Sequence, residues 1–270
     1  MFKTRVISSV VLVALTLGII MIGGPLLCAV MCLVSIRGMW ELYRVLKVHD
    51  LPIAFTGYAA CILHYLDLYF LQGKAFVLIC ISFLVVLLGF YVISYPTYAT
   101  EQFMTVYFGF FYVAVMLSYI YQTRVMENGT YIVWLIFLCS WVSDTFAYLT
   151  GSVLGRHKMA PVLSPKKSVE GAIGGIVASV LLTGLYCYLF RGYTSHGTQE
   201  ILMLALFAGV GACISMIGDL AASAIKRNYD IKDYGNIIPG HGGILDRFDS
   251  VIITAPIIYF LSNLVMYLQK

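Results

Sequence analysis

The stretch from Gly218 to Asp249, GDLAASAIKRNYDIKDYGNIIPGHGGILDRFD, lies between two strongly apolar runs and is dense in charge. It holds five carboxylates and four basic side chains, namely Asp219, Asp230, Asp233, Asp246 and Asp249 with Lys226, Arg227, Lys232 and Arg247. A charge at bilayer depth costs roughly 2.5 to 3.5 kcal/mol on insertion scales, so such groups persist when they are paired or used. We therefore expect this stretch to carry the functional site.

The rest of the chain has the composition of a membrane protein. Of its 270 residues 61% are hydrophobic and only 11% are charged, whereas soluble domains are about 25% charged. Runs long enough to cross a bilayer occur at 51–71, 75–94, 102–121, 130–150, 169–190, 199–218 and 250–268. The first run, 6–36, is broken by Gly23-Gly24-Pro25 and supplies two more. The sequence therefore predicts an all-α, polytopic integral membrane protein with about nine transmembrane helices.

Residues 37–50, RGMWELYRVLKVHD, follow the first run and look different from it. Met39, Trp40, Tyr43 and Leu46 share one helical face, and basic side chains lie off that face. This pattern predicts a separate interfacial helix whose long basic side chains reach toward water.

The placement of basic residues predicts the topology. With the N-terminus in the cytosol, the cytosolic segments carry most of the seventeen Lys and Arg residues, which is the positive-inside arrangement. The opposite side carries Lys74, Arg124, Arg191 and Lys270. We therefore expect a cytosolic N-terminus, a C-terminus on the opposite side, and both polar loops facing the cytosol. Because spans separate the basic residues, they form no continuous face for a nucleic acid.

No internal repeat or linker divides the chain, so we expect one transmembrane domain over 1–270. Residues 1–130 would form apolar N-terminal helices, and 131–270 would form a catalytic half with a polar cavity open to the cytosol. The seven cysteines all lie in apolar runs without a CxxC pair. They are interpreted as small hydrophobic residues rather than as a disulfide framework.

A polar stripe crosses the helix that enters the opening stretch. At 100° per residue, Asp219, Ser223, Lys226 and Asp230 fall on one face, and alanines occupy the other. Such a stripe must face protein or water rather than lipid. Its carboxylate end suits a metal, and its hydroxyl and ammonium groups suit phosphate oxygens.

A glycine-rich turn, Pro239-Gly240-His241-Gly242-Gly243, follows this helix. Its glycines let the backbone approach a ligand closely and aim N–H groups at an anion. His241 is either a group that acts on the substrate or a structural donor in the loop. Asp246 and Asp249 come next and, being three residues apart, share a helix face.

Further candidates lie earlier in the chain. Asp144 is an intramembrane acid and hence a functional candidate; the alternative is a local hydrogen bond to Ser140 that only fixes packing. Lys166 and Lys167 belong to a Ser-Pro-Lys-Lys-Ser turn before the next span. In a segment of net positive charge, these two lysines suit a polyphosphate or an anionic lipid headgroup.

Carboxylates that converge on one place repel each other unless a cation joins them, and hard oxygen ligands favour Mg²⁺. Together with the glycine turn and the basic groups, they indicate phosphoryl or nucleotidyl transfer. The main alternative is a transporter of an anion or divalent cation, which would favour related halves with broken helices at mid-membrane. Another membrane phosphotransferase is a second alternative.

The motif in this region resembles the signature of the phosphatidate cytidylyltransferases, or CDP-diacylglycerol synthases. Its fixed positions are Ser223-x-x-Lys226-Arg227, Lys232-Asp233-x-Gly235 and Pro239-x-His241-Gly242-Gly243-x-x-Asp246-Arg247-x-Asp249. A second similar block is Ser164-Pro165-Lys166-Lys167-Ser168-x-Glu170-Gly171. The resemblance covers roughly the C-terminal half, and the first 130 residues share only apolar character.

The resemblance implies an enzyme that makes CDP-diacylglycerol and pyrophosphate from CTP and phosphatidic acid. It implies an integral membrane enzyme with a Mg²⁺ cofactor, a monovalent cation such as K⁺, and a homodimer. The compact size of the chain and the absence of a long soluble tail predict a multi-pass position in the plasma membrane. The implied metal ligands are Asp219, Asp246 and Asp249, and the catalytic set adds Lys226 and Asp144. The implied substrate-binding residues are Ser223, Arg227, Lys166, Lys167, His241, Gly242, Gly243 and Arg247.

Overall fold

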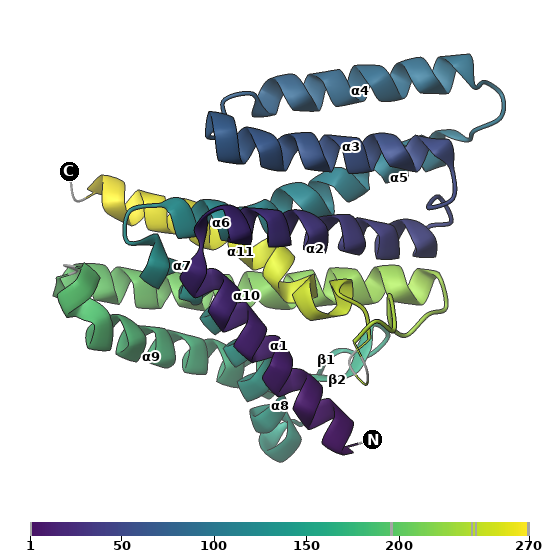
Figure 1. Ribbon diagram of the computed structural model, residues 1–270. Coiled ribbons are helices and arrows are strands. Elements are labelled where there is room, and N and C mark those ends of the chain that lie inside the picture. The colour runs from purple at the N-terminus through teal and green to yellow at the C-terminus, as the bar shows by residue number, and fades with distance from the viewer. Residues whose placement is uncertain (1, 195–196, 239, 241, 269–270) are drawn as a thin grey trace. The chain divides into compact units, whose positions relative to one another are not determined.

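The structure is a computed structural model that describes residues 2–194, 197–238, 240 and 242–268, with side chains from residue 10 onward. Within these residues, eight helical segments are long and apolar enough to cross a membrane, and Val10–Ile22 is a shorter apolar stretch. Helices dominate, and the described strands form a single short hairpin (Figure 1). The prediction of an all-α polytopic membrane protein with about nine spans is confirmed. The orientation of the termini stays a prediction.

The chain groups into two compact units. The first comprises Met1–Tyr121 and Ile231–Arg247, and the second comprises Gln122–Asp230 and Phe248–Lys270. The predicted division into an apolar part, 1–130, and a catalytic half, 131–270, within one domain stays a prediction. Each unit is described by itself below.

The first unit contains the N-terminal helices. They are α1 (Phe2–Ile22), α2 (Gly24–Val45), α3 (Pro52–Leu66), η1 (Asp67–Leu71), α4 (Phe76–Ile93), α5 (Thr100–Gly109), η2 (Phe110–Val115) and most of α6 (Met116–Val125). The predicted break between α1 and α2 is present, because Gly23 and Gly24 have φ values of 66° and 53°, which favour glycine. The labels η1 and η2 mark π-helical segments, and α3 and α4 run side by side (Figure 1).

The predicted interfacial helix at 37–50 is wrong. Residues up to Val45 continue α2 without a break, and Met39, Leu42 and Tyr43 are fully buried. The Tyr43 hydroxyl donates a hydrogen bond of 2.7 Å to the backbone oxygen of Val106. The C-terminal part of α2 therefore continues a candidate span and packs in the core of the first unit.

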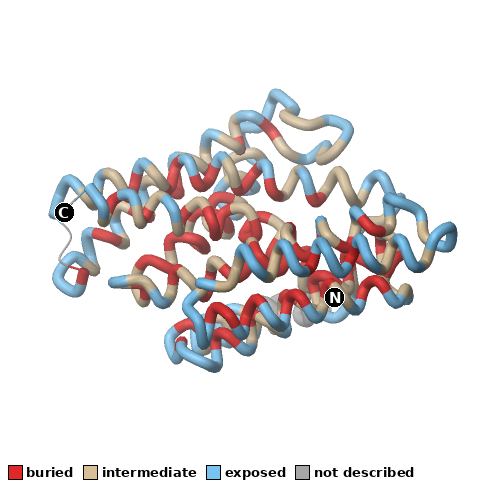
Figure 2. The backbone as a smooth tube through the Cα atoms, turned by 90° about the horizontal axis from the view of Figure 1, so that it is seen from above, coloured by how far each residue is buried: buried red, intermediate tan, exposed pale blue. Residues whose placement is uncertain are grey.

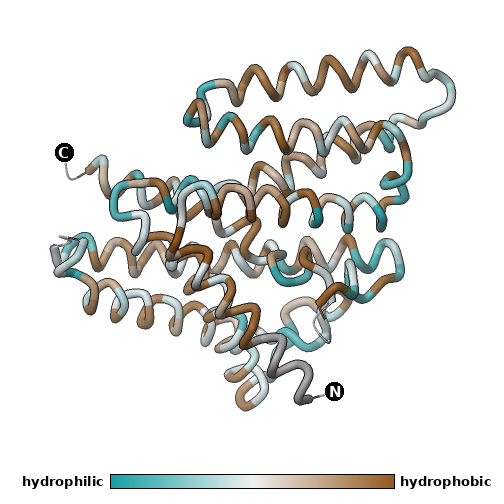
Figure 3. Tube along the Cα trace, in the orientation of Figure 1, coloured by the Kyte–Doolittle hydropathy of each residue, from teal (hydrophilic) through white to brown (hydrophobic). Residues whose placement is uncertain are grey.

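The helix α4 shows why this fold needs a bilayer. It is hydrophobic along most of its length (Figure 3), yet its buried residues are only Phe83 and Leu87. Large apolar side chains such as Val92 and Ile93 are exposed. Figure 2 shows how buried, intermediate and exposed residues alternate along the backbone. An exposed apolar face of this extent marks contact with lipid or with another protein.

The second unit contains α7 (Gly129–Phe137), η3 (Leu138–Val142), α8 (Ser143–Leu154), β1 (Lys158–Ala160), β2 (Ser164–Ser168), α9 (Val169–Thr194), α10 (Thr198–Asn228) and α11 (Leu245–Leu268) from residue 248 onward. The π-helical segment η3 leads directly into α8. The helices α8 and α9 approach closely, since a Cβ on Gly171 would lie 2.6 Å from the backbone oxygen of Ala147.

The hairpin of β1 and β2 orders the basic segment between α8 and α9. The strands pair antiparallel, with Lys158 opposite Ser168 and Ala160 opposite Ser164. The predicted Ser-Pro-Lys-Lys-Ser turn is therefore a strand. Its last residue caps the next helix, because Ser168 Oγ accepts a hydrogen bond of 3.1 Å from the backbone N–H of Gly171.

Candidate active site

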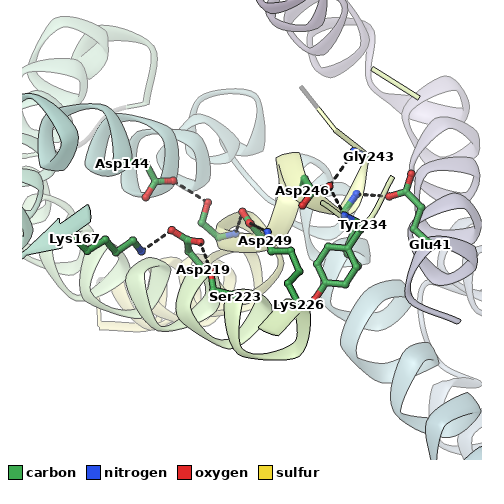
Figure 4. A network of polar contacts seen from close by, with 12 residues as sticks. Glu41, Asp144, Lys167, Asp219, Ser223, Lys226, Tyr234, Gly243, Asp246 and Asp249 are labelled. Atoms are coloured by element: carbon green, nitrogen blue, oxygen red, sulfur yellow. Dashed lines mark hydrogen bonds and ion pairs between the residues drawn. The ribbon is translucent and has the colours of Figure 1, made fainter. Parts of the chain in front are cut away.

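Acidic and basic side chains from four elements of the second unit meet in what we call the acid–lysine cluster (Figure 4). Its members are Asp144 on α8, Lys167 on β2, Asp219, Ser223 and Lys226 on α10, and Asp249 and Ser250 on α11. All of these residues except Ser250 were singled out from the sequence. The structure thus brings together side chains that lie far apart in the chain, such as Asp144 and Ser250, which are 106 residues apart.

The predicted polar stripe forms three of these positions. Ser223 Oγ donates to Asp219 Oδ1 over 3.4 Å, and Lys226 lies almost one turn further along α10. The fourth expected member, Asp230, is not part of the stripe: α10 ends at Asn228, and Asp230 is exposed with a φ of 51°. The stripe therefore stops where the helix stops.

Two ion pairs join the cluster. Lys167 Nζ lies 2.5 Å from Asp219 Oδ2, and the two side chains are 23% and 25% exposed. Lys226 Nζ lies 3.9 Å from Asp249 Oδ2, with exposed fractions of 13% and 14%. Partial burial makes both pairs stronger than surface salt bridges. Each lysine thus pairs with one carboxylate of the cluster (Figure 4).

Asp144 is tied to α11 rather than to its own helix. Ser250 Oγ donates to Asp144 Oδ2 over 3.2 Å, and the backbone N–H of Ser250 donates to Asp249 Oδ1 over 2.8 Å. The single hydroxyl hydrogen of Ser140 goes to the backbone oxygen of Ile136. The alternative of a local Ser140–Asp144 bond is therefore not what holds this acid.

The donor chemistry of the cluster suits a divalent cation. Three carboxylates, Asp144, Asp219 and Asp249, face two ammonium groups, so with all three ionised the cluster would repel a triphosphate. Mg²⁺ in phosphate sites usually takes one or two carboxylates plus substrate oxygens, and Asp219 and Asp249 are close enough to interact electrostatically. Over the described residues, no three His, Cys, Asp or Glu side chains are grouped for one metal. The cluster therefore suits a divalent cation that is bound by its carboxylates and by substrate phosphates together.

The third predicted metal ligand, Asp246, belongs to a different set of contacts in the first unit. It is 6% exposed, and its Oδ2 accepts hydrogen bonds from the backbone N–H groups of Tyr234, over 2.7 Å, and Gly243, over 3.0 Å. Asp246 lies in the first turn of α11, where a carboxylate is favoured by the helix dipole. It therefore ties the loop before α11 to the start of that helix.

A buried glutamate completes this arrangement. Glu41 on α2 is fully buried, and its two carboxylate oxygens accept from the backbone N–H groups of Ile244, over 3.1 Å, and Leu245, over 2.9 Å. We use the name carboxylate cap for Glu41, Asp246 and the backbone amides that donate hydrogen bonds to them (Figure 4). The cap satisfies N–H groups that a helix start otherwise leaves unpaired.

Two glycines of the glycine turn have a left-handed backbone. Gly240 and Gly242 have φ values of 77° and 85°, which favour glycine, and the backbone N–H of Ile238 donates to the oxygen of Gly242 over 3.0 Å. The N–H of Gly243, which we expected to face an anion, donates to Asp246 instead. The Gly243 amide therefore stabilises the loop through Asp246.

The remaining predicted substrate-binding residues lie outside these contacts. Lys166 and Arg227 are exposed, and Arg247 is partly buried. The Nε atom of Arg247 has no hydrogen-bond partner among the described residues. His241 lies outside the described residues.

Sequence reasoning missed two residues, Glu41 and Ser250. The available signal for Glu41 was an acid with Arg37 and Arg44 about one turn away on either side. For Ser250 it was a hydroxyl that directly follows Asp249. Neither pattern is specific, and each gains meaning only from the contacts in the folded chain.

Comparison with known proteins extends the resemblance over nearly the whole chain. A family model described as "Cytidylyltransferase family" matches residues 3–265. A phosphatidate cytidylyltransferase from Staphylococcus haemolyticus (strain JCSC1435) is 31% identical over 266 residues, covering 96% of this chain and 98% of the relative. The protein of the same name from Staphylococcus epidermidis (strain RP62A) is 32% identical over 268 residues, with the same coverage. The one from Staphylococcus aureus (strain COL) is 37% identical over 181 residues, covering 64% and 66% of the two chains.

These matches correct one expectation, because the similarity includes the first 130 residues and not just the C-terminal half. The helices that precede the motif, among them the one that carries Glu41, are thus part of what the family shares. The chain therefore belongs to the cytidylyltransferase family, as a predominantly helical, multi-pass membrane enzyme of that family.

Proposed function

We propose that the chain transfers the cytidylyl group of CTP to phosphatidic acid, forming CDP-diacylglycerol and releasing pyrophosphate. The observation that carries this proposal is the acid–lysine cluster, which gathers anionic and cationic side chains from helices that otherwise suit a bilayer and from the strand β2. A lipid substrate explains a polar cluster among apolar helices, since its acyl chains stay in the membrane while its phosphate needs a polar site.

In the proposed reaction, a phosphate oxygen of phosphatidic acid attacks the α-phosphorus of CTP. A new bond forms between that oxygen and the α-phosphorus, and the bond from the α-phosphorus to the oxygen that bridges to the β-phosphorus breaks. The electron pair of this bond leaves with pyrophosphate. A phosphate monoester has a second pKa of about 6, so the attacking group is already ionised near pH 7 and needs no strong general base.

The chain's own residues would position and neutralise the reacting groups. Lys167 and Lys226 are placed to approach phosphate oxygens, because each ammonium group already neighbours a carboxylate at the cluster. Ser223 and Ser250 hold Asp219 and Asp144 in fixed orientations. Mg²⁺, held by Asp219 and Asp249 with substrate oxygens, would supply the positive charge that the cluster lacks. Asp246 as a third ligand and K⁺ as a second ion remain proposals from family resemblance.

We further propose a homodimer in the plasma membrane, with the N-terminus and both polar loops in the cytosol, where CTP is available. The placement of basic residues supports this topology. Labelling of single introduced cysteines from each side of a sealed vesicle would test the orientation.

The decisive experiment uses the purified chain in detergent with labelled CTP and phosphatidic acid, and follows cytidylyl label in the organic phase. We expect label only with free Mg²⁺, and a loss of about a hundredfold or more in kcat for Asp249→Asn. The matched control is Asp230→Asn, which makes the same change at an exposed acid outside the cluster. Asp249→Asn is cleaner than Asp246→Asn, since Asp246 also holds two backbone amides.

Two outcomes would refute the proposal. A folded wild-type protein that leaves no cytidylyl label in the lipid phase is not this enzyme. Uptake of a labelled anion or divalent cation into vesicles without turnover would instead support a transporter. Near-normal activity of Asp249→Asn would leave the reaction standing but remove this residue from the metal site.

A further inference from the structure

The C-terminal part of α2 holds the loop that leads into α11. Arg44 Nη2 donates a hydrogen bond of 2.6 Å to the backbone oxygen of Tyr234, and Glu41 accepts the amides of Ile244 and Leu245. These partners lie about two hundred residues apart in sequence, at separations of 190 to 204, and all belong to the first unit. Two side chains about one turn apart on α2 thus hold this loop at Tyr234 and at its junction with α11.

Burial of the Glu41 carboxylate has a large cost that the fold offsets locally. Removing an ion from water costs several kcal/mol even after relaxation, and Glu41 is fully buried. Arg37 Nε lies 3.5 Å from Glu41 Oε1, and hydrogen bonds to a charged group contribute about 1.5 to 3 kcal/mol each. An apolar side chain at position 41 would avoid this cost, so we expect the buried carboxylate to have a specific task.

Two glycines of the loop enclose the same carboxylate. A Cβ on Gly235 would lie 2.6 Å from Glu41 Oε1, and one on Gly243 would lie 2.7 Å from the same atom. Both distances are shorter than real Cβ contacts, so the backbone approaches the carboxylate as closely as glycine allows. The position of Glu41 is therefore determined by the loop, and the loop by Glu41.

We propose that Glu41 is a positioning residue for the reaction: by accepting the amides of Ile244 and Leu245, it fixes the start of α11 and with it the orientation of Asp246. Asp246 lies in the first helical turn, directly after the two anchored amides (Figure 4). A loosened helix start lets the Asp246 carboxylate rotate away from its amides at Tyr234 and Gly243. This role rests on the proposed function, and it adds a residue from the N-terminal helices to the functional machinery.

The test compares Glu41→Gln, Glu41→Asp and Glu101→Gln in the full chain. Glutamine is isosteric but has one acceptor oxygen where two amides need two, and its NH₂ group would face an N–H donor. Aspartate keeps the charge on a shorter side chain. Glu101 lies exposed in the first turn of α5 in the same unit, so Glu101→Gln is a matched control.

For Glu41→Gln we expect kcat to fall about tenfold or more, and the Mg²⁺ concentration for half-maximal rate to rise about fivefold or more. Hydrogen exchange of peptides over 242–249 should speed up about tenfold, while peptides from α3 stay unchanged. Glu41→Asp should recover part of the rate, and Glu101→Gln should match the wild type.

The two readouts separate the possible failures. Unchanged exchange and unchanged kcat in Glu41→Gln would overturn the proposal. Faster exchange throughout the first unit, with an unchanged kcat for each folded molecule, would show a purely structural residue and also overturn it. If the wild type makes no CDP-diacylglycerol, the proposed function fails, and hydrogen exchange still decides whether Glu41 anchors the start of α11.

Discussion

Replacing Gly243 with alanine should strain the carboxylate cap from within. The φ of Gly243 does not lie in the left-handed region, so the backbone accepts alanine and the cost comes from contact alone. The new Cβ would lie 2.6 Å from Glu41 Cδ and 2.7 Å from Glu41 Oε1. Because Glu41 is fully buried, its carboxylate can retreat only by stretching its bonds to Ile244 and Leu245.

The size of the effect follows from those two hydrogen bonds. Each bond to the charged group is worth about 1.5 to 3 kcal/mol, and we expect the loss of one and the weakening of the other. A gain of about 0.4 to 1 kcal/mol from the lower entropy of the unfolded chain offsets part of this loss. The net destabilisation is about 2 to 3 kcal/mol, which lowers the Tm of a chain of this size by roughly 5 to 10 °C.

Thermal unfolding in detergent, followed by tryptophan fluorescence, measures this shift. The control is Gly89→Ala on α4, where a Cβ would meet no atom within 4 Å and helix propensity favours alanine by up to about 1 kcal/mol. Equal Tm values for the two variants would refute the view that the cap closes tightly around Gly243.

Three further predictions concern the second unit and the metal. Lys167→Met removes the ammonium group 2.5 Å from Asp219 and should lower kcat/KM for CTP about tenfold to a hundredfold; initial rates equal to wild type would contradict this. Gly171→Ala places a Cβ 2.6 Å from the backbone oxygen of Ala147 and should cost about 1 to 3 kcal/mol, whereas Gly192→Ala, with open space around it, should be harmless in the same unfolding assay. EDTA should abolish transfer and added MgCl₂ restore it, and turnover in excess EDTA would remove the metal from the mechanism.

The sequence predicted those features that depend on short-range periodicity. The spans follow from runs of apolar residues, and the alignment of Asp219, Ser223 and Lys226 follows from spacings of four and three on one helix. The prediction that Asp230 continues this stripe was wrong, because α10 ends at Asn228 and no proline or glycine in the sequence signals that end. A helical period predicts a face only while the helix lasts.

The features that sequence reasoning missed depend on partners far away in the chain. The pattern around Trp40 has apolar and basic faces, which fit an interfacial helix as well as they fit the observed α2. The polar side of α2 faces the loop that carries Tyr234, 190 residues away from Arg44, rather than water. Local amphipathicity cannot distinguish these two polar surroundings, so Glu41 escaped notice although it is central to the carboxylate cap.

The π-helical segment η3, immediately before α8, decides how its span responds to a change in residue number. A π turn inserts one extra residue into an otherwise α-helical path, and each residue advances an α-helix by about 100°. Deleting a single residue within Leu138–Val142 would therefore restore an α-helical turn and leave α8, with Asp144, close to its present orientation. A second deletion would have no wide turn left to absorb it and would rotate Asp144 away from Ser250, so this span should tolerate the loss of one residue but not of two.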